Sequence, residues 1–137
     1  MKPFVVDASV AVKWFIPERN SIEAIKLLKG GQRFFAPDII RPEIGNILWK
    51  LYGRRLLTRD EALQIIVDLL SLPIEICSSE TLIAPAFEIA VSSGRTVYDS
   101  LYIALAVEKN AVVITDDNRL VNALKSTHFA GFVRTLG

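Results

Sequence analysis

The sequence has almost none of the side chains that build disulfides or soft-metal sites. It contains one cysteine, Cys77, and one histidine, His128, in 137 residues. A single cysteine excludes an internal disulfide and a zinc site made of cysteines. A single histidine argues against a histidine pair for acid–base catalysis and against a histidine-rich metal site. Aspartate and glutamate therefore remain as the groups that can carry such chemistry.

Long hydrophobic runs and a strong net charge are also missing. No apolar run approaches the roughly 20 residues of a spanning helix, so we expect no membrane segment. Residues 1–4 lack the features of a signal peptide, and we expect a cytoplasmic protein. The net charge of +1 does not indicate a nucleic-acid binder. The remaining composition, 51% hydrophobic and 23% charged, is typical of one globular domain over residues 1–137.

Charge is less balanced in one part of the chain. Residues 41–60 carry five basic side chains against the two acidic ones Glu43 and Asp60, a local charge of +3. Arg54, Arg55 and Arg59 are the candidates for contacting a polyanionic substrate. The alternative is an ordinary solvated surface on a helix–turn–helix.

Short apolar runs alternate with helical patterns along the whole chain. This alternation predicts an α/β fold with helices on both faces of a mainly parallel sheet of four or five strands. Ligands bind such sheets outside the carboxyl ends of the strands. The predicted strands are 2–6, 33–36, 74–77, 111–115 and one near 132–133, and the predicted helices are 8–16, 21–28, 38–52, 58–70, 79–93, 96–109 and 118–124.

Acidic residues are placed where they favour one shared site. Asp7 follows the first predicted strand, and the pair Asp116 and Asp117 follows the fourth. Glu43 and Asp99 lie on apolar faces of their helices, where a carboxylate is rare unless it is paired. Burying any of these groups costs free energy unless a cation or hydrogen-bond donors compensate it. We therefore expect Asp7, Glu43, Asp99 and Asp117 to share one cleft.

Each acid also has a purely structural explanation. Asp99 is placed to be the third residue of a capping box opened by Thr96, and Asp117 is placed to cap the last helix. Asp7 could be a turn residue. Glu43 could pair with the neighbouring arginine or stabilise a helix N-terminus. These explanations require four unrelated coincidences around one edge of the sheet, so one shared site is the simpler explanation.

An oxygen-only site selects a hard cation, Mg²⁺ or Mn²⁺. Such an ion activates water and supports in-line displacement at phosphorus, so the site predicts a nuclease or another phosphoryl-transfer enzyme. Ser9 and Thr115 each lie two residues from a candidate ligand, and we expect them to donate hydrogen bonds to the ligands or to serve as caps. Asp116 is a possible additional ligand.

Four motifs in this order carry a family resemblance. They are Asp7-x-Ser9, Pro42-Glu43-x-x-Asn46-x-Leu48, Tyr98-Asp99-x-x-Tyr102-x-Ala104-Leu105-Ala106 and Thr115-x-Asp117-x-x-Leu120. Over essentially its whole length the chain resembles PIN-domain ribonucleases, in particular VapC-type toxins.

The resemblance implies a three-layer α/β/α sandwich and an endoribonuclease that cleaves single-stranded or structured RNA. It also implies that the four acids bind Mg²⁺ or Mn²⁺, that the protein is a homodimer, and that a small cognate antitoxin blocks the site.

Two other classes are weighed against this interpretation. A metal-dependent phosphatase or phosphotransfer domain would require a second aspartate where Ser9 stands, or an acidic pair after the first strand. Neither pattern is present. A non-catalytic PIN-fold binding protein would be favoured by the loss of one acid, and all four are present.

The helices predicted at 38–52 and 58–70 carry more apolar residues than one small core can accept. We therefore predict that they form a two-fold homodimer interface. The alternative is that these side chains pack between the two helices of one subunit. The residues concerned are Trp49, Leu56, Leu57, Leu63, Ile66 and Leu70.

Overall fold

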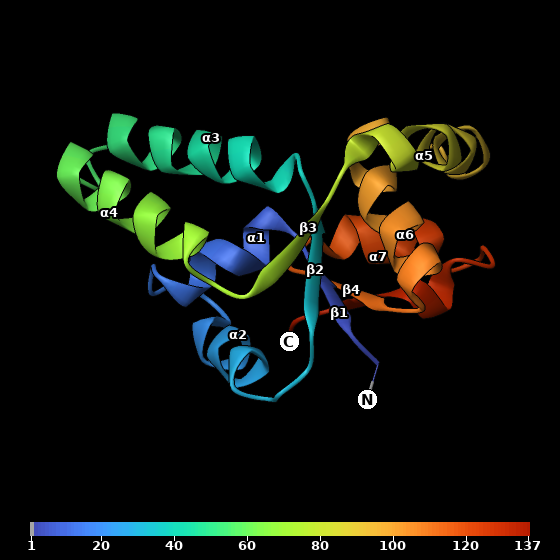
Figure 1. Ribbon diagram of the computed structural model, residues 1–137, viewed down its shortest axis with the longest axis horizontal. Coiled ribbons are helices and arrows are strands. Elements are labelled where there is room, and N and C mark those ends of the chain that lie inside the picture. Colours follow the sequence, from blue (N-terminus) through green and yellow to red (C-terminus); the bar gives the residue numbers. More distant parts are fainter. Residues whose placement is uncertain (1) are drawn as a thin grey trace.

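The computed structural model describes residues 2–137 as an alternation of strands and helices (Figure 1). The strands are β1 (Phe4–Val6), β2 (Phe34–Pro37), β3 (Ile74–Cys77), β4 (Val112–Thr115) and β5 (Val133–Thr135). The α-helices are α1 (Ala8–Ala11), α2 (Ser21–Leu28), α3 (Ile40–Gly53), α4 (Arg59–Leu70), α5 (Ser79–Ser93), α6 (Val97–Lys109) and α7 (Asn118–Leu124), and two 3-10 turns cover Val12–Trp14 and Ala130–Phe132.

The five strands form one parallel sheet in the order β3-β2-β1-β4-β5. The chain builds outward from β1 through β2 to β3 and then crosses back to add β4 and β5 on the other side. The strand order therefore reverses between β1 and β4. Outside the carboxyl ends of such a pair lies the crevice where open parallel sheets bind ligands. The predicted parallel α/β fold is confirmed.

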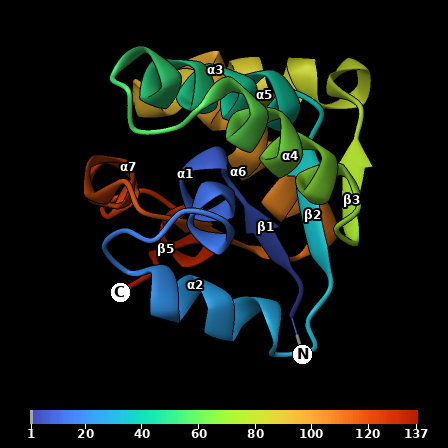
Figure 2. The same cartoon turned by 90° about the vertical axis from the view of Figure 1, so that its left-hand side faces the viewer.

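Helices cover both faces of the sheet and make three layers, as predicted (Figures 1 and 2). Helices α5, α6 and α7 pack against one face, which presents Val5, Phe35 and Val113. Helices α1 to α4 pack against the other face, which presents Val6, Ala36 and Ile114 among others. This division follows from the alternation of side chains along each strand.

Helix α6 is the most deeply buried helix, because every residue from Ser100 to Ala106 is buried. The hydroxyl of Thr96 accepts a hydrogen bond from the backbone N–H of Asp99 and fixes the start of this helix. The helix ends at Asn110, which has a left-handed conformation with φ 50°. A helix locked at both ends and packed along its length gives Asp99 a fixed position above the sheet.

The segment predicted as one helix over 8–16 is shorter and changes type. Helix α1 ends at Ala11 and continues as a 3-10 turn. The indole N–H of Trp14 donates to the carbonyl of Ala24 at 2.8 Å, and its ring packs edge-on against Phe34. These contacts tie the segment to α2 and β2 and favour the tighter turn.

Among the helices of residues 2–137, none combines the length and the hydrophobicity that crossing a bilayer requires.

Candidate active site

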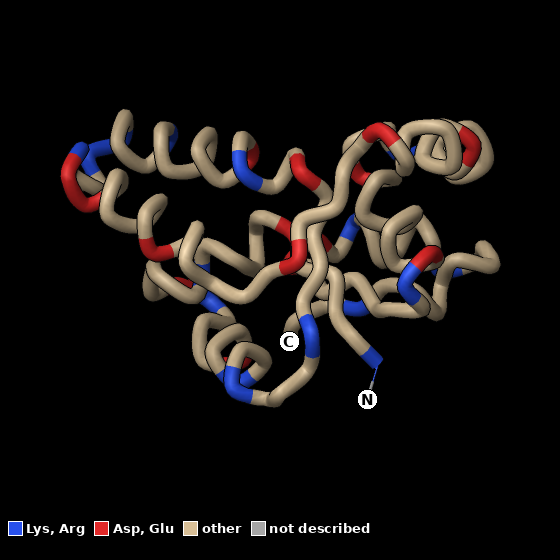
Figure 3. Tube along the Cα trace, viewed as in Figure 1, with Lys and Arg blue, Asp and Glu red and all other residues tan. Residues whose placement is uncertain are grey.

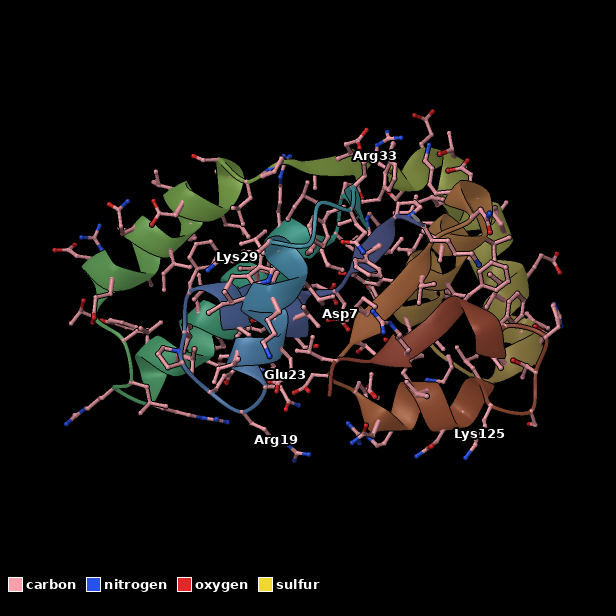
Figure 4. The ribbon with its side chains drawn as sticks, turned by 90° about the horizontal axis from the view of Figure 1, so that it is seen from below. Asp7, Arg19, Glu23, Lys29, Arg33 and Lys125 are labelled. Atoms are coloured by element: carbon pink, nitrogen blue, oxygen red, sulfur yellow. The ribbon has the colours of Figure 1, made fainter. Side chains whose placement is uncertain are left out.

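A cavity of about 280 Å³ lies at the carboxyl edge of the sheet, between α3 of one helical layer and α6 of the other. The four predicted acids all line it. Seen from below, Asp7 is near the centre of the molecule, whereas Arg19 and Lys125 are at its margin (Figure 4). The lining residues are Asp7, Ala8, Ser9, Glu43, Asn46, Ile47, Asp99, Tyr102, Val113, Asp117 and Leu120.

Asp7 is held by three uncharged donors. It caps α1 by accepting a hydrogen bond from the backbone N–H of Val10 at 3.1 Å. Its side chain also accepts from the hydroxyl of Ser9 at 2.6 Å and from the hydroxyl of Thr115. Burial raises the pKa of Asp7, although all three hydrogen bonds act to lower it. Loss of hydration is therefore the larger effect on the pKa of Asp7.

Glu43 lies in the first turn of α3 and meets α6 across the cavity. The phenol of Tyr102 donates a hydrogen bond to its carboxylate. Burial raises the pKa of Glu43, and the negative charges of Asp7 and Asp99 raise it further. Burial and the charge of Glu43 also raise the pKa of Tyr102, so the phenol stays protonated and remains a donor.

Asp99 and Asp117 have arginine partners. The Nη2 atom of Arg95 lies 2.9 Å from Oδ2 of Asp99 and 3.9 Å from Oδ2 of Asp117. Asp117 caps α7 by accepting from the backbone N–H of Arg119 at 2.9 Å. The Nε atom of Arg119 also lies 3.6 Å from this carboxylate, on a side chain that is 90% exposed.

The capping roles and the shared cavity are compatible. Asp7 and Asp117 are both N-caps, and Asp99 occupies the first turn of a capped helix. Each carboxylate therefore sits at the positive end of a helix that starts beside the sheet edge. The fold brings these acids together because the N-termini of their helices lie beside the same edge of the sheet.

Asp116 does not line this cavity, although it is the neighbour of Asp117. Its Oδ2 atom lies 3.2 Å from Nζ of Lys13, and its Oδ1 accepts from the side-chain amide of Asn20 at 3.1 Å. Lys13 is 5% exposed and also contacts Glu18. Adjacent residues at a strand end point to opposite sides, which explains why the acidic pair is divided.

Arg54, Arg55 and Arg59 do not line the cavity either. They are exposed and lie at the turn between α3 and α4. Figure 3 shows basic and acidic segments together at the outer tip of this helix pair. With about 1.5 Å of rise per residue, Arg54 lies on the order of 16 Å along α3 from Glu43. These arginines therefore lie away from the cavity of their own subunit, and their contact with RNA stays a prediction.

Sequence reasoning overlooked the two arginines that do contact the site. Arg95 precedes Asp99 by four residues, and Arg119 follows Asp117 by two. These short spacings in the sequence could have indicated that each arginine lies beside its acid. The partnership of Tyr102 with Glu43 joins positions 59 residues apart, and no local pattern indicates it.

The donor set fits a hard divalent cation in its chemistry, because all four acids offer carboxylate oxygens. As the side chains stand in residues 2–137, no three acidic, cysteine or histidine groups are close enough together to hold a metal ion.

Two comparisons identify the family. The model of the PIN domain matches residues 4–125. The chain is also 33% identical over 118 residues to Ribonuclease VapC3 of Pyrobaculum aerophilum, covering 85% of this chain and 90% of that protein. The chain belongs to the VapC family of PIN-domain proteins.

Solved structures show the same fold as this VapC-family chain. A crystal structure of a protein from Pyrobaculum aerophilum has a TM-score of 0.70 at 24% identity, covering 98% of this chain and 84% of the other. A toxin–antitoxin complex from Klebsiella pneumoniae contains a chain with a TM-score of 0.67 at 14% identity, and the match covers 97% of both chains. The α/β/α arrangement is thus that of the family.

Proposed function

We propose that this VapC-family protein is a cytoplasmic endoribonuclease that depends on Mg²⁺ or Mn²⁺ and hydrolyses single-stranded or structured RNA. The observation that carries the proposal is the meeting of four carboxylates in one cavity where the strand order reverses. The name of the Pyrobaculum relative, a ribonuclease, supports RNA as the substrate.

In this proposal Asp7, Glu43, Asp99 and Asp117 hold the cation. When bound, the cation would supply activation of the attacking water and stabilisation of charge at the phosphate. Ser9 and Thr115 orient the carboxylate of Asp7 by their hydroxyls. Orientation of this kind matters because loss of such outer partners typically costs about 10–100-fold in metal affinity or activity.

Other lining residues shape the space that a phosphodiester would enter. Tyr102 fixes Glu43 from the opposite helical layer, so the phenol sets the distance across the cavity. Ile47, Val113 and Leu120 make part of the wall apolar. Apolar walls exclude water and strengthen the interactions between the remaining charges. Asn46 adds an uncharged amide that can contact a phosphate or sugar oxygen.

Cleavage of RNA with and without the metal tests the proposal. We expect purified protein to cut a single-stranded RNA in Mn²⁺ and to lose this activity in excess EDTA. Asp117→Asn should lower the rate at least about 100-fold, more than the loss of an outer partner. Asp116→Asn is the matched control, because Asp116 lies outside the cavity, and its rate should stay near that of the wild type. Cleavage in EDTA, or equal loss in both variants, would contradict the mechanism.

We further propose that the protein is the toxin of a toxin–antitoxin pair, blocked by a small antitoxin protein. The Klebsiella complex supports such a partner. Co-purification with the product of an adjacent small reading frame, with loss of RNA cleavage in the complex, is the expected result. An RNA-cleaving chain unaffected by that product would oppose this part of the proposal.

Homodimer formation remains a proposal, with a smaller patch than the sequence predicted. Leu57 and Ile66 are partly buried and pack against the core, so they offer less surface to the predicted interface. The patch that remains exposed consists of Trp49, Leu56, Leu63 and Leu70 on α3, α4 and the turn between them.

Sedimentation velocity at micromolar concentration tests this interface. We expect a dimer that Leu63→Glu converts to a monomer. Helix α5 carries a second exposed apolar row, Ile83, Phe87 and Val91. Phe87→Glu is therefore the matched control and should leave the dimer intact. If Phe87→Glu gives a monomer and Leu63→Glu does not, the interface lies on α5 instead.

A further inference from the structure

Arg95 lies at the rim of the cavity in the short connection between α5 and α6. Gly94 ends α5 in the left-handed region with φ 74°, and Thr96 begins α6. The backbone N–H of Arg95 donates to the hydroxyl of Ser93 at 3.2 Å. Its backbone is therefore fixed on both sides, and the movable part is the guanidinium group.

The guanidinium is only partly satisfied where it stands. Its Nη2 atom contacts Oδ2 of Asp99 at 2.9 Å and is 3.9 Å from Oδ2 of Asp117. Within residues 2–137, its buried Nε atom has no hydrogen-bond partner. A settled arginine–carboxylate pair is frequently bidentate, with two parallel hydrogen bonds. This contact instead uses one edge of the group and leaves a donor unused at a cost.

Arg95 occupies the electrostatic position that a cation would take. One positive charge lies between two carboxylates and offsets their repulsion. In the described part of the chain, residues 2–137, no three acidic, cysteine or histidine groups are placed to hold a metal ion. A cation held by Asp99 together with Asp7 or Glu43 would therefore compete for the carboxylate that Arg95 now contacts.

We propose that Arg95 is a positioning residue that competes with the divalent cation for Asp99 and Asp117. The inference rests on the cation site of the proposed function. In the metal-free protein Arg95 holds the two acids apart from the other pair, and cation binding breaks its contact with Asp99. The native arginine thereby lowers the affinity for the cation and keeps the empty site stable.

Calorimetric titration with Mn²⁺ measures the competition. We expect Arg95→Gln to bind Mn²⁺ about tenfold more tightly than the wild type, which corresponds to about 1.4 kcal/mol. Arg95→Lys keeps the positive charge and should stay closer to the wild type. Arg119→Gln is the control, because a charge that is 90% exposed is well screened, and its effect should be about twofold or less.

The outcomes separate this inference from the proposed function. A wild type that binds no Mn²⁺ overturns the cation site itself. A wild type that binds, together with a folded Arg95→Gln that binds equally or more weakly, overturns the competition alone. Circular dichroism in EDTA establishes whether the variant is folded.

A second measurement follows the wild-type chain and does not depend on the folding of Arg95→Gln. The Nε–Hε signal of Arg95 in a ¹H–¹⁵N spectrum is assigned by its absence in Arg95→Lys. We expect saturating Mg²⁺ to shift this signal as the contact with Asp99 breaks. A signal that stays in place while Mg²⁺ binds would contradict the displacement.

Discussion

The two sides of the cavity hold their carboxylates by different means. On the side of α1 and α3, Asp7 and Glu43 accept hydrogen bonds from uncharged donors. On the side of α6 and α7, Asp99 and Asp117 lie beside Arg95 and Arg119. Burial is the main cause of the raised pKa values of Asp7 and Glu43.

Uncharged donors orient a carboxylate, whereas an arginine also neutralises its negative charge. A hydroxyl fixes the direction of a carboxylate but leaves most of its charge, so that charge remains available to attract a cation. Arg95 supplies the opposite charge itself and has to be displaced. We infer that Asp7 and Glu43 form the fixed side of the site and that Asp99 and Asp117 form the side that rearranges.

Thr115 contacts acids on both sides of the cavity. Of the substitutions that test the difference between the two sides, a substitution of Thr115 should have the largest effect. Its buried hydroxyl donates to Asp7 and accepts from the backbone N–H of Asp117 at 3.0 Å. We expect Thr115→Val to lower the free energy of unfolding by about 1–3 kcal/mol, since it leaves buried polar groups unpaired. Cleavage of RNA should fall about 10–100-fold.

Urea unfolding and single-turnover cleavage measure the two effects of the Thr115 substitution. Thr115→Ser keeps the hydroxyl and should retain most of the activity. Wild-type stability and rate in Thr115→Val would show that the hydroxyl does not connect the two sides.

Tyr102→Phe affects the fixed side alone and should have a smaller effect. It removes the donor to Glu43 without changing the shape of the ring. We expect the rate of RNA cleavage to fall about tenfold, at the low end for an outer partner, with the KM for RNA unchanged. Tyr98→Phe is the control, because Tyr98 is exposed and lies outside the cavity lining. Equal rates for the two variants would remove Tyr102 from the site.

The fold could be predicted from the sequence because its signals are local. The predicted bounds agree with the structure for the strand Ile74–Cys77 and for the helices Ser21–Leu28 and Asn118–Leu124. The 3-10 turn over Val12–Trp14 was missed because it depends on a contact between Trp14 and Ala24. Such contacts exist only once the chain has folded.

The site was predictable in part for the same reason. The acids stand at strand ends and helix starts, which a sequence pattern reveals, and parallel topology brings those points together. The direction of each side chain was not predictable. Asp116 and Asp117 differ only in the side to which they point, and Lys13 holds the first of them outside the cavity. The contacts of Arg95 and Arg119 with Asp99 and Asp117 were missed because net charge does not show which basic side chain contacts which acidic one.

Glu43→Gln gives the smallest effect and tests the electrostatic difference directly. Because the folded-state pKa of Glu43 is raised, the folded protein binds more protons than the unfolded chain between the ordinary pKa and the raised one. Stability in EDTA therefore falls as pH rises through that window, and the loss is complete above it. Glutamine removes this loss and still accepts from the phenol of Tyr102. We expect Glu43→Gln to match the wild type near pH 4 and to be more stable than the wild type at pH 8, which a higher Tm would show.

Glu61→Gln supplies the control of opposite sign. Hydrogen bonds from Thr58, the backbone N–H foremost, lower the pKa of Glu61, so its charged form stabilises the protein above the ordinary pKa. Thermal unfolding is measured from pH 4 to pH 8. As the pH rises, the Tm of Glu61→Gln should fall slightly relative to the wild type, whereas the Tm of Glu43→Gln should rise relative to it. If both variants follow the same pH dependence, Glu43 carries no uncompensated charge, and the two sides of the cavity do not differ in the way inferred from their donors.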